Sequence, residues 1–147
     1  MPHPCDVGRN RSFVERDVVA AARRAFLATG YEGTSVDDLV TVTGLHRGSL
    51  YGAFGSKRGL FVAALRQALD DDPDAAAASA SALSLDDAGL DLLLVALLEL
   101  APRDAEVRAI VAGCLSRLDG GGSAAQVLGS RLLARAHLTQ TTEEAAP

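Results

Sequence analysis

The chain has 147 residues, of which 48% are hydrophobic, so it is long enough for one domain or for two small ones, and disorder throughout is excluded. Aromatic residues make up only 4%, which favours helices over sheets. The net charge of −5 conceals an asymmetry, because residues 1–69 carry nine Lys and Arg against six acids, whereas residues 70–147 carry five Arg against thirteen acids. Only the first half is therefore suited to approach phosphates.

Several functional classes are disfavoured at once. Cys5 and Cys114 lie far apart, and without a secretory signal they are expected to be free thiols in a reducing, cytoplasmic compartment. The longest apolar run, residues 92–98, is too short to cross a bilayer, so no membrane partner is expected. The histidines are scattered and neither cysteine has a metal-ligand neighbour or a base partner. We expect no metal, no cofactor and no enzymatic activity.

The first elements are read from periodicity and caps. Residues 1–12 contain two prolines, a glycine and two arginines without periodicity, which predicts a flexible basic arm. A helix is predicted from about Phe13 to Thr29, because its apolar residues fall on one stripe and Gly30 follows. A second helix is predicted after Ser35, which would cap it together with Asp38 in a capping box.

Further helices follow at short intervals. A third is predicted over about residues 46–53, and a fourth, capped by Ser56, continues to about residue 69. Residues 70–82, rich in Asp, Ala and Ser, predict a polar connector. Breaks at Pro102 and at the glycines after residue 119 then predict three more helices, at about residues 85–101, 103–118 and 124–137.

Residues 43–57, TGLHRGSLYGAFGSK, have the composition expected for the second helix of a helix-turn-helix unit. Leu50 and Phe54 supply a buried face at spacing i, i+4, and Gly48 and Gly52 keep the other face narrow enough for a DNA major groove. Glycine costs up to about 1 kcal/mol in a helix interior, so two of them favour close approach to a partner. The candidate donors to base edges and phosphates are His46, Arg47, Ser49, Tyr51 and Lys57.

Taken singly, each of these residues also has a plain structural interpretation. His46 and Ser49 suit a solvated helix cap, Tyr51 suits the edge of the core, and Lys57 and Arg58 suit an exposed first turn. Their order and spacing together favour DNA binding.

The segment from about Val14 to Leu65 resembles the N-terminal domain of the TetR family of bacterial transcriptional repressors. The resemblance rests on the blocks F..TGYEGTSVDDLV...G and G.LYGAF.SK..LF and on the interval between them, and it covers a little over a third of the chain. It implies that the third helix is the recognition helix, that Tyr51 and Lys57 grip phosphates, and that Thr34 and Ser35 cap the second helix and touch the DNA backbone. The DNA-binding residues implied are Thr34, Ser35, His46, Arg47, Gly48, Ser49, Tyr51 and Lys57.

Three positions depart from the family pattern. Family members often carry an aromatic residue and a histidine where this chain has Gly52 and Ala53, which removes two phosphate contacts. Gly59 occupies the capping-box position of the fourth helix, where an acid would be expected, so that helix should start less firmly. Affinity would then depend more on Arg47 and the basic arm.

The predicted fold is therefore all-α. A basic arm (1–12) precedes a three-helix helix-turn-helix domain with a linking fourth helix (13–69), a connector (70–82), a short helical dimerisation or ligand-binding domain (83–138) and a polar tail (139–147). The apolar faces of the last two helices are the predicted dimer interface, with the filling of the monomer core as the alternative. The residues of this interface are Val107, Ile110, Val111, Cys114, Leu115, Leu118, Val127, Leu128 and Leu132.

The resemblance also predicts the function. It implies a homodimeric, sequence-specific repressor that binds a palindromic operator in double-stranded DNA and is released by a small apolar ligand. Two alternatives stay open: a ligand-sensing or dimerisation protein that has lost DNA binding, and a constitutive repressor without an effector, which the short second domain would allow.

Overall fold

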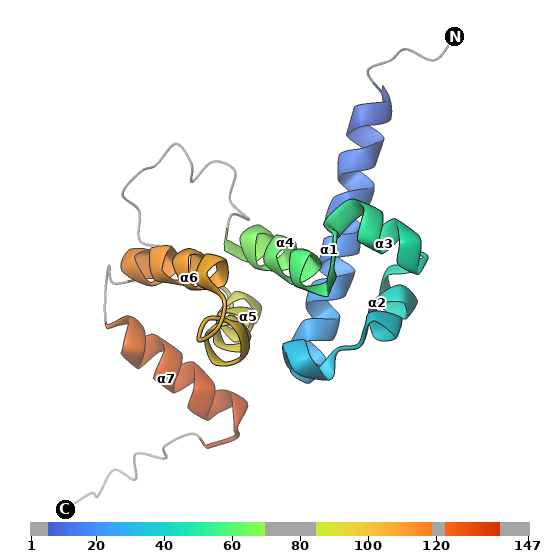
Figure 1. Cartoon of the computed structure of the whole chain (residues 1–147). Coiled ribbons are helices and arrows are strands. Elements are labelled where there is room, and N and C mark those ends of the chain that lie inside the picture. Colours follow the sequence, from blue (N-terminus) through green and yellow to red (C-terminus); the bar gives the residue numbers. More distant parts are fainter. Residues whose placement is uncertain (1–5, 70–84, 119–122, 139–147) are drawn as a thin grey trace, which may run out of the picture.

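The computed structural model describes residues 6–69, 85–118 and 123–138, and within these ranges the chain forms seven α-helices, one π-helical turn and no strand. The all-α prediction is therefore confirmed. Helices α1 (Asp6–Gly33) and α4 (Lys57–Leu69) lie in the middle, with α2 (Val36–Thr43) and α3 (Arg47–Phe54) on one side and the later helices on the other (Figure 1). The predicted connector at 70–82 and tail at 139–147 lie outside the described residues.

Helix α1 differs from its prediction at its start and agrees with it at its end. It begins at Asp6, so residues 6–12, which were expected to belong to a flexible arm, are helical. Regular geometry breaks at Gly30, which adopts φ 78° and ψ 179°, and a last turn continues to Gly33. A positive φ favours glycine because it has no Cβ, so the predicted stop at this residue has a direct physical cause.

The short helix α2 is fixed by the cap that its sequence predicts. The Ser35 hydroxyl accepts a hydrogen bond from the Asp38 amide (3.0 Å), and the Asp38 carboxylate accepts one from the Ser35 amide (2.8 Å). Gly44 ends the helix in the left-handed conformation at φ 71°. Both ends are therefore defined by local residues, which holds the following turn and α3 in place.

Gly55, Ser56 and Gly59 shape the turn from α3 to α4. The Ser56 hydroxyl accepts a hydrogen bond from the Gly59 amide (3.0 Å), so the predicted cap of α4 is present without an acid at position 59. A Cβ at Gly59 would lie 1.9 Å from the carbonyl oxygen of Phe54. Glycine therefore lets the end of α3 and the start of α4 approach closely, a role that the sequence did not reveal.

The second half contains α5 (Asp87–Val95), the π-helical turn η1 (Ala96–Leu100), α6 (Ala105–Leu118) and α7 (Ala124–Arg135). The single α-helix expected over residues 85–101 is thus wrong in detail, because the α-helix ends at Val95 and a π turn follows. None of the helices in the described ranges is both long and apolar enough to cross a membrane.

One hydrophobic core joins the two halves of the chain. Phe26 of α1 and Phe61 of α4 are fully buried with their rings 5.1 Å apart, and Tyr31 packs against both rings. Helix α5 adds the fully buried Leu92 and Leu93. Because α1 and α4 share their core with α5, the helix-turn-helix unit rests on the second half rather than standing apart from it.

The predicted dimer interface needs correction at three positions. Val107, Val111 and Cys114 of α6 are 0%, 2% and 4% exposed and belong to the core of the chain itself, so they cannot meet a second copy. With so few helices in the second half, the apolar face of α6 is needed to cover η1 and α4. The other predicted interface residues are half-buried against the core or exposed: Ile110, Leu115, Leu118, Val127, Leu128 and Leu132.

Candidate nucleic-acid interface

Helix α3 is buried on one side and exposed on the other. Leu50 is 5% exposed and Phe54 packs against the core, which anchors the helix on α2 and α4. The opposite side presents most of the predicted site residues together, because they come from this one helix and its N-terminal cap. The exposed residues are His46, Arg47, Gly48, Ser49, Tyr51, Gly52 and Ala53.

Nothing in the described chain requires a glycine at position 48 or position 52 of α3. Apart from the neighbouring residues and the backbone of α3 itself, no heavy atom of the described chain lies within 4 Å of the place where a Cβ of Gly48 or Gly52 would be. Neither residue has a positive φ. An alanine would fit at both positions and would favour the helix by about 0.5–1 kcal/mol each. The exposed face is therefore lower in bulk than the fold requires.

Arg47, the first residue of α3, is tied to α2. Its Nη2 donates to Oδ1 of Asp37, while the side chains remain 57% and 83% exposed, respectively. The ion pair was not predicted, because its partners lie on different helices.

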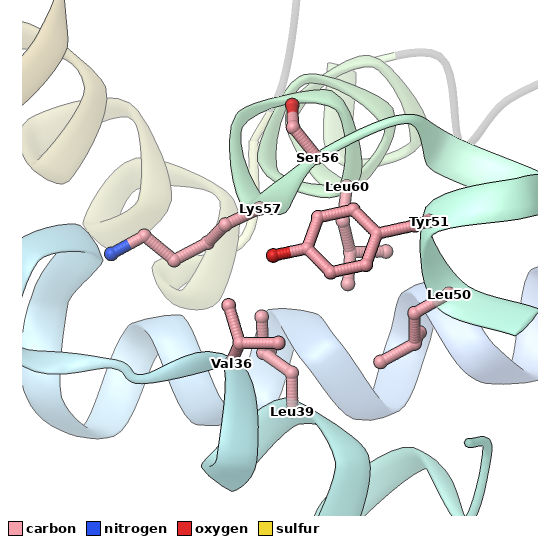
Figure 2. Close-up of a pocket in the computed structure, with 7 residues that line it drawn as sticks. All are labelled: Val36, Leu39, Leu50, Tyr51, Ser56, Lys57 and Leu60. Carbon is pink, nitrogen blue, oxygen red and sulfur yellow. The ribbon is translucent and has the colours of Figure 1, made fainter. Parts of the chain in front are cut away.

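Tyr51 covers a small cleft where α2, α3 and α4 meet. Its ring extends from α3 over Val36 and Leu39, with the hydroxyl directed toward the side of the cleft where Lys57 lies (Figure 2). The residue is 42% exposed. It therefore combines a core-edge position with a phenol that solvent or a partner can reach.

Lys57, a predicted phosphate contact, also has partners within the fold. Its Nζ donates to the carbonyl oxygens of Tyr31 (3.0 Å) and Thr34 (3.1 Å) and lies 4.3 Å from the centroid of the Tyr31 ring. Figure 2 shows the side chain running away from Tyr51. Two carbonyl acceptors and an aromatic face satisfy the ammonium group and link α4 to the end of α1.

Thr34 cannot contact DNA through its side chain, contrary to the prediction. It is 0% exposed, its hydroxyl donates to the carbonyl oxygen of Gly30 (2.6 Å), and it shares a hydrogen bond with the Thr29 hydroxyl (2.8 Å). A buried hydroxyl needs such partners, and the break in α1 supplies one.

Ser35 is exposed, as a phosphate contact would need, but its hydroxyl already serves the capping box. The hydrogen bonds from Ser35 lower the pKa of Asp38.

Charged groups also tie α4 and the end of α1 to the second half of the chain. Arg58 of α4 donates to Asp104, which caps α6 by accepting from the Val107 amide, and to Glu106. Its hydrogen bonds hold the pKa of Asp104 well below the usual range and lower that of Glu106. Near the break in α1, Oε2 of Glu99 accepts from the Glu32 amide (2.7 Å). No local sequence signal marks these contacts, since the partners lie 46 to 67 residues apart.

Comparison with known proteins bears directly on this arrangement. The family model of bacterial regulatory proteins of the tetR family matches residues 18–64, which contain α2, α3 and most of α1 and α4. Residues 18–64 are therefore similar to the DNA-regulatory domain that this family model describes, over about a third of the chain. The expected resemblance is thereby confirmed, and its extent agrees with the two sequence blocks on which the expectation rested.

Curated relatives match the same part of the chain. An uncharacterized HTH-type transcriptional regulator YezE of Bacillus subtilis is 42% identical over 64 residues, which are 44% of this chain and 33% of that protein. The HTH-type transcriptional repressor BdcR of Escherichia coli is 38% identical over 60 residues (41% and 30%), and AcnR of Corynebacterium glutamicum is 40% identical over 52 residues (35% and 28%). The chain thus spans about a third of the length of these relatives. The names of these relatives describe transcriptional regulators and repressors.

The fold is similar over a longer stretch. A crystal structure of a putative TetR-family transcriptional regulator from Mesorhizobium loti superimposes with a TM-score of 0.57 over 85% of this chain and 70% of that one, at 19% identity. The tetR-like all-α arrangement therefore extends beyond the matched domain into the helices that follow it.

Proposed function

We propose that this chain is a sequence-specific DNA-binding transcriptional regulator whose helix α3 enters the major groove. The observation on which the proposal rests is the exposed, low-bulk face of α3, where Gly48 and Gly52 leave space that no part of the described chain uses. A helix that lies in a groove needs such a face, with its N-terminal residues toward the base edges. The tetR-family match of residues 18–64 and the names of the relatives support the same function.

The proposal is tested by DNA binding at two salt concentrations. DNA from around the protein's own gene would be titrated at about 50 and 200 mM salt, because the logarithm of the binding constant should fall by about 0.9 per phosphate contact for each log unit of salt. Arg47→Ala should weaken specific binding by roughly tenfold to a hundredfold. Arg117→Ala, which removes an exposed positive charge from α6, should leave it unchanged. Absence of specific binding by the unmodified protein at both salts would favour the ligand-sensing or dimerisation alternative.

A homodimer belongs to the same proposal, with α7 as its main contact. Val127, Leu132 and Leu133 on this helix are 36%, 43% and 40% exposed. A second copy related by a two-fold axis would cover them and place two α3 helices about 34–36 Å apart on a palindromic operator. Light scattering after size-exclusion chromatography should give a dimer that Leu132→Glu converts to monomer. Val42→Glu, at an apolar residue of α2 that is 46% exposed, is the matched control.

Release by a small effector completes the proposal. An open groove of about 350 Å³ lies between the end of α1, α5, η1 and α7, and its apolar lining includes Leu94, Leu98 and Leu132. This volume is within the range of ligand pockets. The carboxylate of Glu99 also lines the groove and bonds to the Glu32 amide, which would connect an occupant to the end of α1. A thermal-shift screen of small apolar compounds distinguishes an effector-responsive regulator from a constitutive one.

A further inference from the structure

Asp37 stands out among the acids of the helix-turn-helix unit. It lies in the first turn of α2, next to Asp38, but only Asp38 takes part in the capping box. The carboxylate of Asp37 instead accepts from Nη2 of Arg47, at the N-terminal end of α3. Two adjacent acids therefore have different partners, and that of Asp37 is on the helix that the proposed function places in the groove.

The charge balance of this pair bears on what Arg47 can recognise. Arg47 is the one residue of α3 with a full charge, since the helix reads RGSLYGAF. Paired with Asp37, it forms a neutral unit, and an exposed carboxylate beside it repels phosphates. A neutral pair gains little by approaching a phosphate but can still donate hydrogen bonds to a base edge.

The hydrogen-bond donors of Arg47 are suited to a base edge. A guanidinium has five N–H donors in a rigid planar fork, and Asp37 occupies a site on Nη2. Donors remain for the O6 and N7 acceptors of guanine, the base that arginine most often reads in the major groove. The single contact at Nη2 favours the side-chain conformations of Arg47 in which this nitrogen faces Asp37, and the other donors stay unoccupied by that carboxylate.

We propose that Asp37 is a specificity-determining positioning residue, which holds Arg47 to read a guanine in the major groove and disfavours its use as a phosphate contact. This inference rests on the proposed function. It predicts that Asp37 increases the preference for guanine and weakens non-specific binding to DNA. A residue that merely stabilised α2 would change neither.

The test is a selection from random double-stranded DNA, followed by titrations against selected and scrambled duplexes. Arg47→Ala should lower the preference for guanine at one position of each half-site by roughly tenfold to a hundredfold. Asp37→Asn should lower the same preference, strengthen binding to scrambled DNA and steepen the salt dependence by about 0.9 in log–log slope for each freed arginine. Asp37→Glu keeps the charge but moves the carboxylate, so it should lower the guanine preference without strengthening non-specific binding.

Controls separate this effect from charge and stability. Asp17→Asn on α1 makes the same change in net charge at an exposed acid and should match the unmodified protein. Circular dichroism at 222 nm would verify that each variant is folded. An unchanged guanine preference in folded Asp37→Asn, with its loss in Arg47→Ala, would overturn the inference and leave the proposed function intact. Failure of the unmodified protein to select any motif would instead overturn the proposed function, and the inference with it.

Discussion

Gly59 offers the sharpest test of how α3 is held against α4. In a helix, replacing glycine by alanine normally stabilises a protein by about 0.5–1 kcal/mol, because alanine loses less conformational entropy on folding. At Gly59 the new Cβ would lie 1.9 Å from the Phe54 carbonyl oxygen, whereas an ordinary carbon–oxygen contact is about 3.3 Å or more. The end of α3 or the start of α4 would therefore have to move by more than 1 Å.

The expected result is a net destabilisation. Inserting a methyl group into a tightly packed place costs about 1–3 kcal/mol, which exceeds the helical gain. We expect Gly59→Ala to lower the free energy of unfolding by about 1–2 kcal/mol and Tm by about 2–8 °C for a chain of this size. Gly113→Ala is the matched control, since Gly113 is exposed in α6 and a Cβ there would meet no atom of the described residues within 4 Å. That variant should be more stable than the unmodified protein.

The measurement is urea and thermal unfolding followed by circular dichroism at 222 nm. Protein concentration must be the same for all variants, because the apparent stability of a dimer depends on it. Equal or greater stability of Gly59→Ala, beside a stabilised Gly113→Ala, would refute the close approach of α3 and α4 at this residue.

Three further predictions concern charges and the buried thiol. Arg58→Gln and Asp104→Asn should each lower Tm, because each removes the same ion pair between α4 and the start of α6. The double variant should therefore lower Tm by less than the sum of the two single losses. Additive losses in this double-mutant cycle would contradict the prediction. The pKa of Asp38 and that of Asp104 are lowered in the folded state, so the stability from these groups is present above the unfolded pKa of about 3.9 and is lost as pH falls below it. The midpoint of urea unfolding should therefore decline below about pH 4. A midpoint that stayed constant down to pH 2 would contradict the lowered pKa of Asp38 and Asp104. Burial raises the pKa of the Cys114 thiol, so in a Cys5→Ser variant the remaining thiol should react with a disulfide reagent far more slowly in buffer than in urea.

Local chemistry explains which parts of the structure the sequence predicts well. The cap formed by Ser35 and Asp38, the break at Gly30 and the cap at Ser56 each depend on residues a few positions apart. The exposed face of α3 follows in the same way from the spacing of Leu50 and Phe54. Such features are encoded within one or two turns of helix, so a single sequence is sufficient to find them.

The features that were missed depend on packing between distant segments. Lys57 donates to carbonyl oxygens 23 and 26 residues away, a non-local contact that no local sequence pattern indicates. Thr34 looks like an exposed cap residue in the sequence, but it is buried and its hydroxyl donates to the carbonyl oxygen of Gly30. The apolar face of α6 fits a dimer interface or a core equally well by periodicity, and only the burial of Val107 in the folded chain shows that it belongs to the core. Helical spacing identifies a buried face but does not reveal what covers it.

The central claim is that the open face of α3 approaches DNA, and alanine substitutions at Gly48 and Gly52 test it most directly. Each substitution should raise the free energy of unfolding by about 0.5–1 kcal/mol, because the described part of the chain leaves the space open. Each should also weaken binding to the selected operator by about tenfold, or about 1.4 kcal/mol, since the added methyl groups would collide with the groove. Gly113→Ala should raise stability without changing affinity. Unchanged or tighter operator binding by the stabilised Gly48→Ala and Gly52→Ala variants would contradict the claim.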